Sequence, residues 1–240
     1  MKKLIAILVL CFAGLTFAQS SIATPAPREH RGFYSNASFG LNLNLFDNSM
    51  EDINEYDDRT ERSIDFYEYY GFSFFHSEFK FGYALGNVVA FHLVFNMGIY
   101  LGTVDYHEEN FTTTCTKDGF CHEVRDPGRD EIPSSSDGYN FRTYIGFGST
   151  FYPFRDKNSP LNGFFFGGSF GYTLFVMASS DATGNGGIGF QLELGKEWWV
   201  SDHFSIGLGL GFAHNGLVWK TVDSHRSDNV LSLSFRLTRG

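Results

Sequence analysis

The segment VVAFHLVFNMGIYLG, from Val88 to Gly102, alternates between large apolar residues and small or polar ones. Side chains point alternately to the two faces of a strand, so this segment as a strand has one apolar face and one polar face. A helix would spread His92 and Asn96 around its circumference and hold its glycines and β-branched residues at unfavourable positions. The segment therefore predicts a β-strand, with an imidazole and an amide opposite an apolar row.

The same alternation recurs in seven further stretches. They are GFYSNASFGLNLNLF (32–46), FFHSEFKFGYAL (74–85), YNFRTYIGFGSTFY (139–152), FFFGGSFGYTLFVM (164–177), IGFQLELGKEWWV (188–200), HFSIGLGLGFA (203–213) and NVLSLSFRLT (229–238). Most of them reach the roughly 9–11 residues that a tilted strand needs to cross a bilayer. The sequence thus predicts an all-β domain of eight strands.

The first 18 residues, MKKLIAILVLCFAGLTFA, predict a secretory signal peptide, because two lysines precede a short apolar run and a small residue ends it. Leu10 stands before Cys11 where a lipobox needs a small residue, so we expect no lipidation. We expect residues 19–31 to form a flexible N-terminal segment and residues 32–240 to form one domain. No later apolar run reaches the roughly 18 residues of a spanning helix.

Cys115 and Cys121 flank the turn-like sequence TKDGF. An exported chain meets oxidising conditions, so we expect these two cysteines to form a local disulfide. The alternative is a metal site with His107 and His122, but the spacing matches no zinc pattern. We therefore expect neither a metal nor another cofactor.

The connections between the predicted strands alternate in length. Short or moderate ones fall at 86–87, 155–160 and 201–202, and long polar ones at 47–63, 103–137, 179–187 and 214–228. Short turns at one end and long loops at the other are typical of bacterial outer-membrane barrels.

Over residues 32–238 the chain resembles the family of small eight-stranded bacterial outer-membrane β-barrels, on this pattern of strands and loops. The resemblance implies an antiparallel up-and-down transmembrane β-barrel, a monomer in the outer membrane of a Gram-negative cell. It also implies contact with membrane lipid and lipopolysaccharide, and folding by the barrel assembly machinery. Members usually end on an aromatic residue, whereas here Phe235 is set back from the end, FRLTRG.

The polar faces predict a filled interior, because eight strands leave room only for side chains. Three acids and three bases lie on these faces, together with an imidazole that we expect to be structural; they are Glu78, Glu193, Glu197, Lys80, Arg142, Arg236 and His92. Unpaired ions in such a place are costly, so we expect ion pairs. Lys196, Trp198, Tyr83 and Tyr152 are expected to anchor the barrel at the membrane interface.

Negative charge is concentrated in two of the long connections. Without Lys2 and Lys3 the chain has 16 basic and 27 acidic residues, a net of −11. Residues 47–63 hold seven acids and two bases, and residues 103–137 hold nine acids and three bases. Their net charges of −5 and −6 together equal the −11 of the chain without Lys2 and Lys3. These loops are either a solvated surface or a place for divalent cations or a basic partner. The negative sign of this net charge disfavours the binding of nucleic acid.

We expect a structural or surface-interaction role through the acidic loops, and no enzyme. The sequence offers two candidate catalytic sets: His76 with Ser77 and Glu78, and His214 with Asn215, Ser224 and His225. Neighbouring strand residues point to opposite faces, which separates the first set, and the second has no recognisable motif. A narrow pore, a lipid-modifying enzyme and a soluble lipocalin-like barrel remain as alternatives; the last requires apolar residues inside.

Overall fold

The computed structural model describes residues 29–56, 59–116, 120–156, 158–178, 183–201, 203–216 and 225–240. Nine strands occupy them: β1 Gly32–Glu55, β2 Arg59–Leu85, β3 Val89–Cys115, β4 Cys121–Arg125, β5 Ser134–Phe151, β6 Phe164–Ala178, β7 Thr183–Trp199, β8 Phe204–Gly216 and β9 His225–Arg239. The predicted signal peptide, and the predicted flexible segment up to residue 28, lie outside the described residues. Among the described residues no helix is long and apolar enough to cross a membrane.

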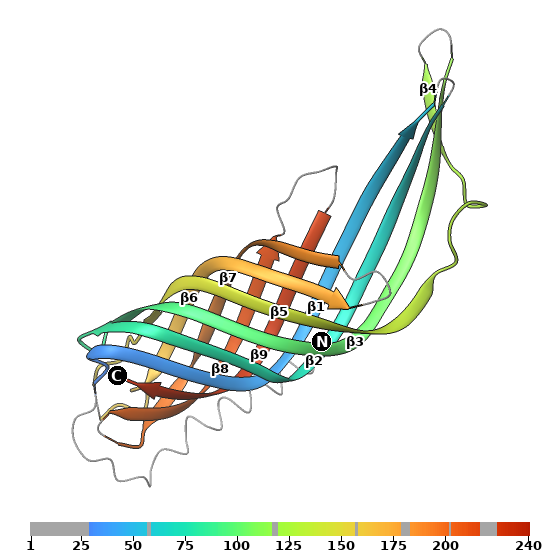
Figure 1. The fold of residues 1–240 in the computed structure, drawn as a ribbon. Helices are drawn as coiled ribbons and strands as arrows, with labels where there is room; N and C mark the ends of the chain where they lie inside the picture. Colours follow the sequence, from blue (N-terminus) through green and yellow to red (C-terminus); the bar gives the residue numbers. More distant parts are fainter. Residues whose placement is uncertain are drawn as a thin grey trace.

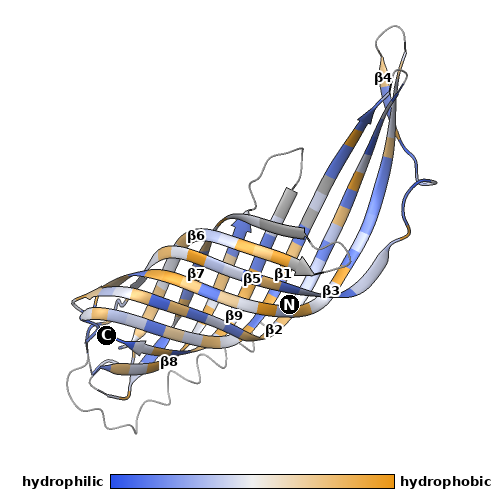
Figure 2. Cartoon of the chain, viewed as in Figure 1, coloured by the Kyte–Doolittle hydropathy of each residue, from blue (hydrophilic) through white to orange (hydrophobic). Residues whose placement is uncertain are grey.

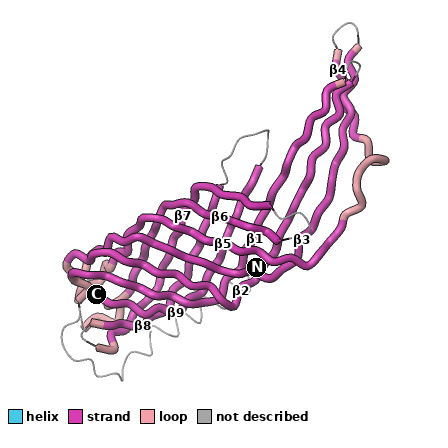
Figure 3. The backbone as a smooth tube through the Cα atoms, in the orientation of Figure 1, coloured by secondary structure: helices cyan, strands magenta, loops and turns pink. Residues whose placement is uncertain are grey.

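Eight of these strands form a closed ring (Figure 1). β1, β2, β3 and β5 to β9 each pair antiparallel with the next strand along the chain, and β9 pairs with β1. β4 lies outside the ring and pairs only with β3. The predicted all-β, antiparallel, up-and-down architecture with eight strands in the ring is confirmed. Figure 3 shows how completely strands account for its wall.

Three strands continue far beyond the ring. β1, β2 and β3 have 24, 27 and 27 residues, whereas β1 pairs with β9 only up to Ser49 and β3 with β5 only up to Tyr106. Past these points β1, β2, β3 and β4 form a four-stranded sheet that projects from one end of the ring (Figure 1). We call this sheet, with the chain that follows β4, the arm: residues 50–66 and 107–133.

The arm corrects the prediction of loops at 47–63 and 103–137. Their high charge suggested irregular structure, but Thr112, Thr113 and Thr114 are β-branched and favour strands. The arm strands are largely hydrophilic, while apolar residues run along the strands of the ring (Figure 2).

A bulge in β2 explains why the alternation seemed to begin at Phe74. The pairing of β2 shifts register between Phe72 and Phe75 against β3, and between Gly40 and Asn42 on β1. The Phe75 N–H donates to Ser73 Oγ there, at 3.2 Å. Before the bulge the buried residues of β2 have odd numbers, and after it most of them, such as Lys80 and Ala84, have even numbers, so a single period-two pattern does not extend across it.

The end of the ring opposite the arm includes the short connection between β2 and β3 and the longer one, 152–163, between β5 and β6. Gly86 and Asn87 join β2 to β3 with φ of 57° and 55°. Two consecutive positive φ values define the type I′ turn that suits a two-residue hairpin, and the pair Gly-Asn tolerates them. The predicted turn at 86–87 is therefore present. Both Gly32, paired with Ala84, and the last residue, Gly240, lie at this end.

Candidate functional sites: the ring interior and the arm

The ring has its apolar side chains outside and its polar side chains inside. In β3, Leu93 and Ile99 are more than half exposed, while His92, Asn96 and Tyr100 are almost completely buried. The same contrast holds in the other ring strands; exposed examples are Phe33, Phe81, Ile145, Phe170, Leu192 and Phe235, and buried examples are Asn36, Asn42, Lys80, Arg142, Thr150 and Arg236. The interior is therefore a polar core inside an apolar wall.

One cluster of ions lies in the half of the interior away from the arm. Lys80 contacts Glu78 at 3.0 Å and Glu193 at 2.5 Å. Arg236 contacts Glu193 at 2.6 Å and Glu197 at 3.3 Å. The strands β2, β7 and β9 thus bring together five of the six ionic residues predicted to lie inside. We call these five residues the lower cluster.

Arg142 is the sixth, and it pairs elsewhere. Its Nε donates to Asp228 Oδ2 at 2.9 Å, and both side chains are 1% exposed. Asp228 also accepts hydrogen bonds from Asn215 at 2.8 Å and from Asn44. We call Arg142, Asp228 and these two amides the upper cluster. Sequence reasoning placed Asp228 at the end of a loop, but it belongs to β9, where it is two residues from the buried Val230 and shares its face.

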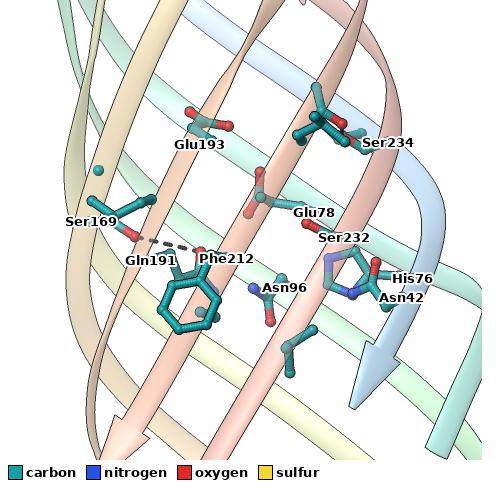
Figure 4. Close-up of a pocket in the computed structure, with 18 of the residues that line it drawn as sticks. Asn42, His76, Glu78, Asn96, Ser169, Gln191, Glu193, Phe212, Ser232 and Ser234 are labelled. Atoms are coloured by element: carbon teal, nitrogen blue, oxygen red, sulfur yellow. Dashed lines mark hydrogen bonds between the residues drawn. The ribbon is translucent and has the colours of Figure 1, made fainter. Parts of the chain in front are cut away.

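A polar cavity separates the two clusters. Its volume is about 40 Å³, and its walls include Asn42, His76, Asn96, Gln191 and Ser232 (Figure 4). Several buried atoms at this cavity have no hydrogen-bond partner in the protein; they are Asn42 Oδ1, His76 Nδ1, His92 Nδ1, Asn96 Oδ1 and Arg142 Nη2. The set mixes donors and acceptors, and the volume suits about three water molecules. The cavity thus has the chemistry of a hydration site.

His92 lies beside this cavity. Its Nε2 is 2.9 Å from Thr150 Oγ1, and its ring stacks on Tyr34 with centroids 5.7 Å apart. Thr150 in turn donates to Glu193 at 3.3 Å. The two polar residues that interrupt the apolar run of 88–102 therefore face the interior, where His92 is joined to the lower cluster and Asn96 lines the cavity.

The predicted interfacial anchors have different surroundings. Tyr83 is 59% exposed on the outer wall, and Lys196 lies 5.7 Å from the Trp198 ring. Lys196, however, is only 2% exposed, because it donates a hydrogen bond to the carbonyl of Pro160 in the connection after β5. A lysine so enclosed does not reach out to lipid headgroups.

Tyr152 differs from the prediction altogether. It is 2% exposed and lies inside the ring, with its hydroxyl 3.4 Å from that of Tyr34 and 3.5 Å from Glu197. Tyr152 continues the inward-facing row of Arg142 and Thr150 by one residue past the end of β5, so the alternation itself places it inside, and its prediction as an interfacial anchor was wrong. Its backbone N–H donates instead to the carbonyl of Val88, at 2.8 Å.

Neither candidate catalytic set is assembled in the described residues. His76 lines the cavity and Glu78 pairs with Lys80, while Ser77 lies between them in β2. His214 Nδ1 is 2.8 Å from Asn229 Oδ1, and Ser224 lies outside the described residues. Within the same described ranges, no three His, Cys, Asp or Glu side chains are grouped so that they could hold a metal ion.

Ion pairs cross the strands of the arm. Arg62 of β2 contacts Glu51 of β1 and, at 3.2 Å, Glu123 of β4, and it lies over the ring of Phe111 in β3 at 5.3 Å. One guanidinium thus links all four strands. At the tip, β3 and β4 are joined by the expected disulfide between Cys115 and Cys121.

The chain after β4 is fastened to the strands β2 and β3 of the arm by Glu61 and Asn110. The N–H of Asn110 donates to Asp130 at 2.8 Å and its carbonyl accepts from Asp126 N–H at 2.8 Å, while Arg129 contacts Glu61 at 3.0 Å. The hydrogen bond from Arg129 holds the pKa of Glu61 below its usual range. That from Asn110 lowers the pKa of Asp130.

The arm keeps an excess of negative charge after this pairing. Residues 50–66 and 107–133 hold 14 acids and five bases, a net of −9. The four arginines Arg59, Arg62, Arg125 and Arg129 are all paired with acids of the arm itself. Among the described residues of the arm, no guanidinium therefore remains to neutralise the other carboxylates.

No family model and no curated protein matches this chain. Solved structures with a similar fold include the outer membrane protein OprG of Pseudomonas aeruginosa, with 10% identity over 88% of this chain and 97% of that one, at a TM-score of 0.39. Neisserial surface protein A has 12% identity over 85% and 96%, also at 0.39. Ail of Yersinia pestis has 10% identity over 86% and 99%, at 0.33. At these scores the fold is established by the strand pairing itself.

Proposed function

We propose that the chain is an integral protein of the bacterial outer membrane, with the ring as a transmembrane β-barrel and the arm as a contact surface outside the cell. The observation that carries this proposal is the inversion of the ring, whose ions are buried and whose phenylalanines and leucines are exposed. If this wall faced water, the monomer would associate, because exposed apolar patches of this extent drive association. Lipid accommodates the same wall without cost.

The height of the apolar band supports a bilayer. On β3 the exposed row runs from Phe91 to Leu101, and Asp105 follows it. Ten residue steps of ~3.3 Å, tilted by ~40°, rise ~25 Å, which is the height of the apolar band on outer-membrane barrels. The opposite row of β3 carries His92 and Asn96, which a bilayer does not tolerate without partners.

The soluble lipocalin-like alternative does not fit this arrangement, because it requires an apolar interior. A narrow pore is also disfavoured. Within each ionic cluster, side chains of different strands pair inside the ring, and the cavity between the two clusters has a volume of only about 40 Å³. An enzymatic role has no supporting geometry in the sets that were considered. We therefore infer a structural and surface-interaction protein, bounded by membrane lipid and, on the outer leaflet, by lipopolysaccharide.

The arm is the part suited to contact. Its strands continue those of the barrel, so it stands as a rigid sheet rather than as separate loops, and its net charge of −9 favours a basic partner. Exposed apolar side chains on the arm offer contact area beside the charge; they are Ile53, Tyr56, Phe120, Val124 and Ile132.

Membrane fractionation, followed by gel mobility with and without boiling, tests the barrel. Recovery in the outer membrane with a heat-dependent shift is expected, and a soluble protein without a shift would refute the proposal. The arm is tested with oligolysine, whose binding to the reconstituted protein should weaken as salt is added. The double variant Asp52→Asn with Glu55→Gln should bind oligolysine more weakly than the wild type at the same salt concentration. The matched change Asp156→Asn, at the opposite end of the ring, should have no effect on this binding. Equal binding by all three proteins would exclude the arm as the contact surface.

A further inference from the structure

The permanent charges inside the ring do not balance. The described interior has three bases, which are Lys80, Arg142 and Arg236, and four acids, which are Glu78, Glu193, Glu197 and Asp228. The upper cluster has one ion of each sign, because Arg142 pairs with Asp228. The lower cluster is therefore left with two bases and three acids. An ionised carboxylate without a counterion is strongly unfavourable inside a barrel.

Glu197 is the most completely surrounded of the three acids. Its Oε1 accepts a hydrogen bond from Thr238 at 2.9 Å and lies 3.3 Å from Arg236. Its Oε2 accepts from Ser205 at 2.8 Å and lies 3.2 Å from the ring of His30. Both oxygens of this carboxylate are thus in contact with buried side chains.

His30 fills the space on the far side of Glu197. It is 1% exposed, although the sequence around it suggested a flexible segment. Its ring stacks on Tyr152 with centroids 4.2 Å apart and lies 4.6 Å from the ring of Trp199. The surroundings of Glu197 are therefore closed by aromatic rings.

Glu78 is the acid with the least compensation. Within the described residues its one ion pair is with Lys80, at 3.0 Å, and Lys80 is shared with Glu193. Glu193 in turn contacts both bases of the lower cluster, since Arg236 lies 2.6 Å from it. The side chain of Glu78 is 14% exposed, and it lines the cavity between the two clusters. The surplus negative charge therefore lies at the wall of this cavity.

Two amide oxygens line the same cavity. Asn96 is directly opposite Glu78 in the ladder of β2 and β3, so the two side chains are neighbours (Figure 4). Asn96 is 2% exposed and Asn42 of β1 is 1% exposed. Neither Asn96 Oδ1 nor Asn42 Oδ1 has a hydrogen-bond partner among the described residues. A buried acceptor without a donor is unfavourable, so both oxygens require a ligand.

We propose that the cavity holds one monovalent cation, such as Na⁺, bound by the Glu78 carboxylate and the Asn96 amide oxygen. Carboxylate, amide and water oxygens are the ligands that hard cations take. One Na⁺ brings the lower cluster to three charges of each sign, whereas a divalent ion would leave an excess of positive charge. The cavity of about 40 Å³ has room for such an ion with about two water molecules.

The bases that border the cavity do not supply this charge. Lys80 is already divided between Glu78 and Glu193. The charge of Arg142 is matched by Asp228, and its unpartnered Nη2 donates to a water molecule of the cavity. This inference goes beyond the proposed function, because it concerns the interior alone and holds whether or not the arm contacts a partner.

Urea unfolding of the purified protein in detergent micelles tests the proposal. Na⁺ is replaced stepwise by N-methylglucamine at constant chloride concentration, since N-methylglucamine is too large for a cavity of about 40 Å³. Because only the folded protein has the site, each tenfold rise in Na⁺ above the Kd should lower the unfolding equilibrium constant about tenfold. N-methylglucamine should have no such effect.

Three variants locate the ion. Glu78→Gln keeps the shape of the side chain and leaves the lower cluster with two charges of each sign, so its stability should not respond to Na⁺. Asn96→Leu keeps the surplus charge but loses the amide oxygen, so it should need about tenfold more Na⁺ for the same effect. Glu123→Gln is the matched control, because Glu123 is also paired with an arginine, Arg62, but lies on the arm. It should respond to Na⁺ as the wild type does.

Equal stability of the wild type in Na⁺ and in N-methylglucamine would overturn the proposal, since the third carboxylate would then be balanced by a proton, on Glu78 itself or on His30. An undiminished response to Na⁺ in Glu78→Gln would also overturn it, because the ion would then bind elsewhere. If a variant fails to fold, the comparison of the two cations on the wild type still decides whether a cation is bound.

Discussion

Replacing Arg142 with methionine should destabilise the protein strongly, because it leaves Asp228 as a buried carboxylate without a cation. The two side chains are each 1% exposed and 2.9 Å apart. Removing one partner of such a pair costs ~3–5 kcal/mol. Asp228 retains the amide hydrogen bonds from Asn215 and Asn44, so we expect the lower end of that range.

A loss of about 3 kcal/mol corresponds to roughly 150-fold in the folding equilibrium. The assay is urea unfolding of the protein in lipid vesicles, followed by gel mobility without boiling. The double variant Arg142→Met with Asp228→Asn removes the uncompensated charge, so it should recover at least half of the loss. Such recovery measures the coupling between the two residues.

Arg239→Met is the matched control. Arg239 is also in β9, but it is exposed and lies 5.8 Å from the Phe33 ring. Its loss should change the free energy of unfolding by no more than about 0.5 kcal/mol. If Arg142→Met costs no more than Arg239→Met, the upper cluster is solvated, and the argument for a filled, non-conducting interior fails.

Three further results are expected. Leu192→Arg, in the middle of the outer row of β7, should cost ~2–4 kcal/mol in vesicles, against ~0–1 for Tyr83→Arg at the rim; equal small effects in urea titrations would indicate a soluble barrel. Cys121→Ser should ease local opening of the arm tip by roughly 2 kcal/mol in hydrogen exchange, without changing the heat-dependent gel shift. Since the pKa values of Glu61 and Asp130 are lowered in the fold, their fastening of the chain after β4 is complete above the usual carboxyl range. It should be lost as pH falls below about 4, as increased pepsin cleavage there would show.

The alternation of side chains was enough to predict the ring. Strand 88–102 has its exposed and buried residues as the pattern requires, and so do the seven others, because each ring strand has one face toward each environment. Two of the predicted anchors were wrong for other reasons. Tyr152 continues the inward-facing row of β5 and was assigned to the membrane interface against that row, and Lys196 keeps its outward direction but is covered by the chain near Pro160.

The arm and the partners of the buried ions could not be predicted from the alternation of side chains. Acidic residues at 50–66 look like loop residues until the partner strand supplies Arg62 across the sheet. The pairing of Arg142 with Asp228 joins residues 86 positions apart, and it depends on the register of strands that meet only when the ring closes. His30 lies in a segment whose composition indicates disorder, and only the aromatic rings and carboxylate around it make it part of the fold.

The distribution of charge agrees with the proposed placement of the ring in a bilayer. A bilayer requires an apolar outer wall, and an interior filled by side chains requires paired ions, so the ring has little room for net charge. The arm lies outside both constraints and carries −9 of the −11 that remain once the two lysines of the predicted signal peptide are subtracted. Because its strands continue the hydrogen-bonded ladders of the ring, this charge is held at a fixed distance from the wall. A partner drawn to the arm would therefore be held clear of the outer leaflet, whose own negative charge would otherwise compete for it.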